Sequence, residues 1–352
     1  MTTAKFKSMA AGALLLLAGL QPSLAEETNI DVGLDKPITV KKGGLKKIAL
    51  FIEIGTNSAV QSTVTGAKEE AAKHGIEIDV FDARFDVARQ VNQMQNALLG
   101  GYDAWIVAAI EGNQVCNMAA KEAPEAGIPV AIVTMSICGR SVNEGEQLWS
   151  PGTLTYVGGN ETPSAFKRVI MQAVKDKPGP QKIALLTGQE IHPITQAFDK
   201  AVAEVSKEHP EVNVVAEYRT DYSPEMNQQK TQVLLQAHPD VDAIVGVYTN
   251  MSKGAAAALD AAGRAGQVRL YEAGGTKWSV DAIKSGTISA TTGYYRATAA
   301  ATAVRLLVDA FDGKAVPHVV LNDGHVLLPG QAEGEVAIIT KANIDTYTPQ
   351  SP

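Results

Sequence analysis

Several residue types are scarce in this chain of 352 residues, and their scarcity excludes whole classes of protein. Lysine and arginine number 31 against 38 aspartates and glutamates, and they form no cluster, which argues against nucleic acid as a partner. The six histidines show no spacing typical of a metal site. We therefore expect no bound metal, no other cofactor and no nucleic acid.

Motifs of the common parallel-sheet enzymes are also missing. No G-x-G-x-x-G follows the first apolar strand, where residues 53–57 read EIGTN, so no dinucleotide site is indicated. The chain contains no P-loop and no G-x-S-x-G nucleophile elbow. We predict that this protein is not an enzyme.

Long apolar runs are limited to one, near the start, and it is too short to span a bilayer. Two lysines precede the apolar stretch Met9–Leu20, and Ser23 and Ala25 form a small-x-small cleavage site. This order is typical of a signal peptide, here residues 1–25. No cysteine lies near that site, so a lipid anchor is not expected. The mature protein is predicted to be soluble and exported, into a bacterial periplasm.

Cysteine occurs twice, as Cys116 and Cys138. In an exported protein a single pair is more typical of a disulfide than of a metal site. Each cysteine follows a predicted strand, 104–109 or 128–135, and the carboxyl ends of consecutive parallel strands are neighbours. A disulfide between them would stabilise the fold by roughly 3 kcal/mol on the chain-entropy model.

From residue 46 onward, apolar strands alternate with amphipathic helices. The first strand, 46–54, is a continuous apolar run typical of a strand buried on both faces of a parallel sheet. A helix is predicted at 59–74, and ligands of open parallel sheets bind between such strand and helix ends, here residues 54–60. Further strands are predicted at 76–82, 103–109, 128–135 and 153–157, and further helices at 86–99, 113–126 and 161–175.

The second half repeats the first. KIAL at 47–50 recurs at 182–185, and in each half a Gln-rich helix precedes a strand that begins Asp-Ala. This order predicts two similar α/β lobes, each with a doubly wound parallel sheet. The second half is predicted to contain strands 182–187, 212–218, 241–248, 267–273 and 287–293, helices 194–208, 224–237, 252–263, 277–285 and 296–312, and short strands near 318–321, 325–328 and 335–339.

With this layout the sequence resembles the type I periplasmic sugar-binding proteins of ABC transporters, the ribose-binding group in particular. The most specific segment is AHPDVDAIVGVYTNMSKGAAAAL at 237–259. Three further family-like segments are GAKEEAAKHGIEIDV at 66–80, EAGIPVAIV at 125–133 and VDAIKSGTISATT at 280–292. The resemblance extends over residues 46–330.

The resemblance implies two lobes that enclose a ligand and are joined by a three-segment hinge. The crossovers are expected near 157–160, 292–295 and 322–325. The expected lobes are 46–158 plus 294–323 at the N-terminal side and 159–293 plus 324–352 at the C-terminal side. Residues 26–45 read as a polar lead-in, which we expect to drape over the surface.

Ligand-binding positions of the family match this chain only in part. Asn57 matches an asparagine of the first-strand loop, Tyr222 matches a stacking aromatic residue, and His192 lies near a family arginine. Tyr248 replaces an amide, and Tyr294 replaces a glutamine. Residues at other strand ends complete the expected set: Arg84, Glu111, Asn250 and Trp278. The alternative role for a polar residue at a strand end is helix capping.

Three departures from the family are plain. The aromatic pair that follows the asparagine in ribose binders is absent, since Ala59 and Val60 stand there. The Asp-Arg pair that binds sugar hydroxyls appears here as Thr134 and Met135, and the carboxylate usual near Gly274 is missing. The fold implied by the resemblance survives these departures, but ribose or galactose as the ligand does not follow.

The resemblance implies the solute-binding component of an ABC importer. Such a protein captures a small polyhydroxylated ligand, a sugar or sugar alcohol, by hinge closure and delivers it to a membrane permease. We expect a monomer. The alternative that the sequence leaves open is an exported sensor for a signal molecule or for a non-sugar ligand, aromatic or nucleoside-like.

Overall fold

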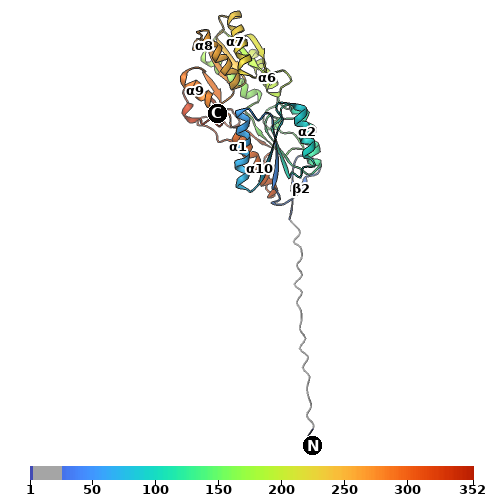
Figure 1. Ribbon diagram of the computed structural model, residues 1–352. Coiled ribbons are helices and arrows are strands. Elements are labelled where there is room, and N and C mark those ends of the chain that lie inside the picture. Colours follow the sequence, from blue (N-terminus) through green and yellow to red (C-terminus); the bar gives the residue numbers. More distant parts are fainter. Residues whose placement is uncertain (3–25) are drawn as a thin grey trace.

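The computed structural model describes residues 1–2 and 26–352, and the predicted signal peptide lies outside the described residues except for its first two. The described chain forms two six-stranded sheets and one antiparallel strand pair. Helices cover both large sheets, and the two lobes follow one another along the long axis of the molecule (Figure 1). No helix within the described ranges is long and apolar enough to cross a membrane.

The first sheet has the strand order β13-β7-β6-β5-β3-β4, and all its neighbouring strands pair in parallel. Its strands are β3 (Lys47–Ile52), β4 (Glu77–Asp82), β5 (Ala104–Val107), β6 (Val130–Thr134), β7 (Thr155–Gly158) and β13 (Val319–Val320). Its helices are α1 (Ser58–Lys73), α2 (Val87–Ala97), α3 (Gly112–Asn117), α4 (Ala123–Glu125) and α10 (Arg296–Phe311), with short turns η1 (Met118–Glu122) and η2 (Gly145–Leu148).

The residues of β3 explain why helices cover both faces of this sheet. Ile48, Leu50 and Ile52 point to one face and pack in the core formed with α1 and α10. Ala49 and Phe51 point to the other face and pack in the core that includes residues of α2 and α3. Because side chains alternate along a strand, an unbroken apolar run requires apolar cover on both sides.

A close approach between α1 and α10 depends on one glycine. A Cβ atom placed on Gly66 would lie 2.0 Å from the backbone oxygen of Ala297. The missing side chain therefore allows α10, which comes from the end of the chain, to pack directly against α1 (Figure 1).

The second sheet has the order β14-β12-β11-β10-β8-β9. Its strands are β8 (Gln181–Thr187), β9 (Val212–Arg219), β10 (Ala243–Gly246), β11 (Arg269–Glu272), β12 (Ala290–Thr292) and β14 (Ile338–Thr340). The helices of this lobe are α5 (Pro163–Asp176), α6 (Pro193–Glu208), α7 (Pro224–Ala237), α8 (Thr249–Ala261) and α9 (Lys277–Ser285), followed by the turns η3 (Asn322–Gly324) and η4 (Ile344–Thr346). The edge strand β14 alone runs antiparallel to its neighbour, β12.

The chain passes between the two sheets three times, after β7, after β12 and after β13. Hydrogen bonds join these crossovers to one another. The carboxylate of Asp323 accepts bonds from the Asn160 amide and from the backbone N–H of Tyr295, the latter at 2.9 Å. Because each partner lies on a different crossover, one buried carboxylate ties the three segments together.

Two expectations about local structure are wrong, and a third is incomplete. The lead-in lies on the surface, as its mostly exposed residues show, but it is not irregular: β1 (Glu27–Ile30) pairs with β2 (Ile38–Lys41), and the side chains of Ile30, Val32 and Ile38 are buried in the first lobe. Residues 325–328 form no strand, and Val326 is 80% exposed. The helix predicted at 113–126 is interrupted by the π-helical turn η1. The lead-in segment is polar overall, but burial of its few apolar side chains is favourable enough to hold it against the first lobe.

The predicted disulfide between Cys116 and Cys138 is confirmed. It joins α3 to the loop after β6, at the carboxyl ends of neighbouring strands β5 and β6. The loop that continues from Cys138 then reaches the second lobe. Ser141 donates to Gln196 at 2.9 Å, and the Lys200 ammonium donates to the carbonyl of Val142 at 2.7 Å.

Candidate functional site

A cavity of about 400 Å³ lies between the lobes, at the carboxyl ends of strands from both sheets. Residues after β3, β4 and β6 line it from the first lobe, and residues after β8, β9, β10 and β11 line it from the second. Its polar or aromatic lining includes Glu53, Asn57, Phe85, His192, Asp221, Tyr222, Tyr248, Asn250, Lys253, Tyr294 and Arg296. This is the position at which open parallel sheets bind ligands.

Asn57 has two roles. It lines the cavity, and its side-chain oxygen caps α1 by accepting the N–H of Ala59 at 2.8 Å and that of Val60 at 3.4 Å. Capping occupies the oxygen and leaves the amide NH₂ group as the donor that a ligand can use. Asn57 therefore caps α1 and also lines the cavity.

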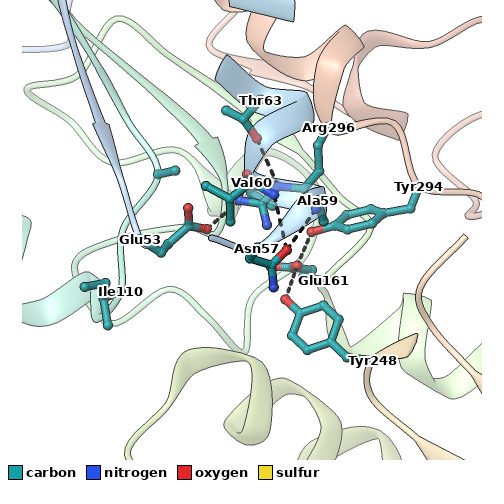
Figure 2. A network of polar contacts seen from close by, with 12 residues as sticks. Glu53, Asn57, Ala59, Val60, Thr63, Ile110, Glu161, Tyr248, Tyr294 and Arg296 are labelled. Atoms are coloured by element: carbon teal, nitrogen blue, oxygen red, sulfur yellow. Dashed lines mark hydrogen bonds and ion pairs between the residues drawn. The ribbon is translucent and has the colours of Figure 1, made fainter. Parts of the chain in front are cut away.

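A buried ion pair forms the floor of the first-lobe side. Arg296, at the start of α10, pairs with Glu53, at the end of β3, and donates to the hydroxyl of Thr63 at 3.1 Å (Figure 2). The two charged side chains are 4% and 6% exposed. Burial alone would lower the pKa of Arg296, but the charges of Glu53 and Glu161 and the hydroxyls of Tyr294 and Tyr248 together outweigh burial and raise the pKa. The second carboxylate oxygen of Glu53 is buried and has no hydrogen-bond partner among the described residues, and Glu53 itself borders the cavity.

A second buried carboxylate, Glu161, holds two tyrosines of the site. Tyr248 donates its hydroxyl to Oε1 of Glu161 at 2.6 Å, and Tyr294 donates to the same oxygen (Figure 2). Glu161 lies on the first crossover, Tyr294 on the second, and Tyr248 follows β10. Burial raises the pKa of Glu161, and Arg296 nearby works in the opposite direction. The carboxylate therefore fixes the orientation of both rings.

Aromatic rings from both lobes form a continuous series along the cavity. Phe85 of the first lobe stacks on His192 of the second at 6.0 Å between ring centroids. His192 lies 5.5 Å from Tyr222, and Tyr222 lies 5.8 Å from Tyr248. Burial lowers the pKa of His192 to about 4, so its ring is neutral at pH 7. Stacked rings with polar edges can contact the apolar faces of a cyclic ligand.

Six of the nine residues predicted from the sequence line this cavity: Asn57, His192, Tyr222, Tyr248, Asn250 and Tyr294. Three do not. Arg84 lies in an exposed turn with φ of 55°, and the carboxylate of Glu111 caps α3 through the N–H groups of residues 113 and 114. Trp278 packs against the core of the second lobe, with the Lys253 ammonium 5.8 Å from its ring. Helix capping occupies the side chain of Glu111 and packing that of Trp278, whereas Arg84 is exposed outside the cavity lining.

Six residues described above were not among the predicted site residues: Glu53, Phe85, Glu161, Asp221, Lys253 and Arg296. Glu53 belonged to a predicted strand, Arg296 and Glu161 were the first residues of predicted helices, and Phe85 lay between a predicted strand and a predicted helix. A charged residue at the end of an apolar strand, such as Glu53, is the signal that would have suggested the ion pair. Its partner, Arg296, lies 243 residues further along the chain, so local sequence does not reveal the pair.

Comparisons with known proteins agree with this geometry. The model of the periplasmic binding protein domain matches residues 48–315, which is more than half of the chain. The chain belongs to the periplasmic binding protein family. It is a type I solute-binding protein, not an enzyme, and this family is periplasmic or otherwise extracytoplasmic.

Individual relatives of this periplasmic binding protein are distant. The ribose import binding protein of Bacillus subtilis is 24% identical over 281 residues, which cover 79% of this chain and 86% of the relative. The ribose import binding protein of Escherichia coli is 27% identical over 260 residues, covering 72% of this chain and 81% of the relative. The structure of the Caulobacter myo-inositol binding protein matches with a TM-score of 0.74 and 20% identity, over 88% of this chain and 98% of that one. The structural likeness supports the fold with two parallel-sheet lobes.

Proposed function

We propose that this protein is the solute-binding component of an ABC importer and captures a neutral sugar or sugar alcohol between its lobes. The observation that carries the proposal is the cavity itself, because both sheets direct their carboxyl ends into it and both lobes supply its side chains. A ligand in this position contacts both lobes at once.

The chemistry of the lining supports a polyhydroxylated ligand. Asn57 and Asn250 supply amides, and Glu53 borders the cavity with its carboxylate. The rings of Tyr222 and His192 supply apolar faces with polar edges. Hydroxyl groups both donate and accept, so they can satisfy such a mixed set, whereas an unpaired buried polar group costs about 1–3 kcal/mol. The relatives that bind ribose or myo-inositol support the same ligand class.

The mechanism follows from the three crossovers. We take the lobes to be 46–158 plus 294–323 and 159–293 plus 324–352, and they rotate about the crossovers as nearly rigid bodies. Ligand contacts that exist only when the lobes are together shift the population toward the closed form. The closed form, a monomer, then delivers its ligand to a membrane permease. Cleavage of the signal peptide after Ala25 places the mature protein in the periplasm.

The relatives do not favour the alternative, a sensor for a signal molecule or for an aromatic or nucleoside-like ligand. A direct test is a thermal-shift and tryptophan-fluorescence titration of the mature protein, stripped of ligand by unfolding and refolding. The panel contains pentoses, hexoses, inositols and acyclic polyols, with nucleosides as the competing class. We expect one or more of the sugars or polyols to raise Tm and to saturate at micromolar concentration.

A matched pair of variants locates the binding. Asn250→Ala removes an amide from the cavity, and Asn213→Ala removes one from an exposed position on β9. Loss of one ligand hydrogen bond should weaken affinity about tenfold in the first variant and leave the second unchanged. Saturation by nucleosides alone, or equal affinities in both variants, would reject the proposal.

A further inference from the structure

The last residues of the chain lie between the two lobes. Strand β14 and the turn η4 belong to the second lobe, and Tyr347 is buried in its core. Beyond Tyr347, residues 348–352, here called the C-terminal strap, run toward the start of α1. Figure 1 shows the C-terminus between α9 of the second lobe and α1 of the first.

The strap is bonded to the first lobe through Gln350. The Gln350 amide oxygen accepts the backbone N–H of Thr298 at 3.1 Å, and its nitrogen donates to the Thr298 hydroxyl at 2.6 Å. Thr298 lies in the first turn of α10. A side-chain amide that both accepts from and donates to one residue holds a defined orientation.

A buried serine of α1 adds a second attachment. The hydroxyl of Ser62 is 2.9 Å from the carbonyl oxygen of Gln350 and 2.9 Å from the hydroxyl of Ser351. Ser62 and Ser351 are each 6% exposed. Because a hydroxyl has one donor and two acceptor sites, Ser62 can donate to the Gln350 carbonyl and accept from Ser351.

The same strap is bonded to the second lobe. The backbone N–H of Lys277, the first residue of α9, donates to the carbonyl of Ser351 at 2.8 Å. The next residue, Pro352, borders the interlobe cavity. One short segment therefore contacts α1 and α10 on one side, α9 on the other, and the cavity at its end.

The position of these bonds has a consequence for lobe movement. Rotation about the three crossovers that separates α1 from α9 must break the bonds of the strap to one lobe or the other. Like the loop at Ser141 and Val142, the strap therefore links the lobes through hydrogen bonds, in addition to the three crossovers.

We propose that the C-terminal strap holds the lobes in their ligand-enclosing arrangement and that Pro352 forms part of the cavity wall. The strap favours the closed form before ligand arrives, and its wall limits the size of ligand that fits. The wall role rests on the proposed function of the cavity, whereas the link between the lobes does not.

The test measures the separation of the lobes without ligand. Nitroxide labels on Ala88→Cys in α2 and Gln229→Cys in α7, both exposed positions, report an interlobe distance by pulsed electron paramagnetic resonance. The full-length chain with both labels is compared with a labelled chain that ends after Tyr347 and with a labelled chain that carries Gln350→Ala. The matched control is Gln267→Ala, because the Gln267 amide donates to Gly263 within the second lobe.

We expect both strap variants to move the distance distribution to longer values, while Gln267→Ala leaves it unchanged. Unchanged distributions in both strap variants would overturn the proposed link. Gln350→Ala keeps the test decisive if the shortened chain does not fold.

Calorimetric titration with D-ribose and myo-inositol tests the wall. If the full chain saturates with either compound, the shortened chain should bind it about tenfold more weakly, and equal or tighter binding would overturn the wall role. If the full chain binds neither these nor the other compounds of the panel, the proposed function fails, and the distance measurement still decides whether the strap links the lobes.

Discussion

Tyr248 donates its hydroxyl to the carboxylate of Glu161 at 2.6 Å, and this bond connects the end of β10 to the first crossover between the lobes. A residue that lines the interlobe cavity is thus bonded to a residue of the first crossover. In the proposed mechanism, a ligand that contacts the Tyr248 ring would therefore act on the geometry of that crossover.

Removing the Tyr248 hydroxyl should destabilise the folded protein. Tyr248→Phe leaves a buried carboxylate with one donor fewer, so we expect the free energy of unfolding to fall by about 1–3 kcal/mol. Urea titration followed by circular dichroism measures this change. The control is Tyr218→Phe, on the edge strand β9, for which we expect a change within about 0.5 kcal/mol. Equal effects of the two substitutions would contradict the assignment of the bond to Glu161.

Glu161 should make the protein less stable as pH rises. Burial raises its pKa above the usual 4.5, so the folded state binds a proton that the unfolded state has already released. Its contribution to the free energy of unfolding is complete below pH 4.5 and is lost as pH rises through the folded-state pKa. Glu161→Gln removes this component, so the stability of the variant relative to the wild type should increase between pH 5 and pH 8. A constant difference between their urea midpoints would refute this prediction.

His192 should have the opposite effect from Glu161 and make the protein less stable as pH falls. Burial lowers its pKa from 6.5 to about 4, so the unfolded state takes up a proton that the folded state does not. The contribution of the neutral ring is complete above pH 6.5 and is lost as pH falls toward 4. We expect a loss of about 2 kcal/mol in the free energy of unfolding between pH 7 and pH 5 from this group.

The test for His192 is the same urea titration at both pH values, with His192→Gln beside the wild type. The glutamine variant should lose this part of the acid sensitivity. His238→Gln serves as the control, because His238 ends α7 outside the cavity and has no part in the predicted effect. A wild-type loss that persists in His192→Gln would assign the acid sensitivity to other groups.

The disulfide should stabilise both the fold and the contact between the lobes. Replacing Cys116 and Cys138 by serine should lower the free energy of unfolding by roughly 3 kcal/mol on the chain-entropy model. The loop that follows Cys138 bonds to the second lobe through Ser141 and Val142, so ligand affinity should also fall. Urea titration and calorimetry measure the two effects. An undiminished free energy of unfolding in the double variant would contradict the structural role.

The order of helices and strands was predictable from the sequence because a buried parallel strand and a surface helix have distinct apolar patterns. The run of β3 and the amphipathic pattern of α1 are examples. The return of α10 to the first lobe was expected from the resemblance rather than from periodicity. The lead-in strands were missed because their three buried apolar residues stand in a polar segment.

The candidate site was predictable mainly where residues follow strands in family positions, as Asn57 and Tyr222 do, and Asn250 was predicted from its place after a strand alone. The pairing of Arg296 with Glu53, and of two tyrosines with Glu161, depends on crossovers that bring distant segments together. Local sequence patterns carry no information about such pairs. Arg84 and Glu111 show the converse, because a polar residue at a strand end is as readily used in a turn or a helix cap.

The most direct test of the central claim is a crystal structure of the mature protein with a sugar or polyol that saturates it. We predict ligand density between the lobes, in contact with Asn57, Tyr222 and Asn250. Density only in a separate cavity within the second lobe, lined by Arg168 and Gln331, or on the outer surface of either lobe, would contradict the claim.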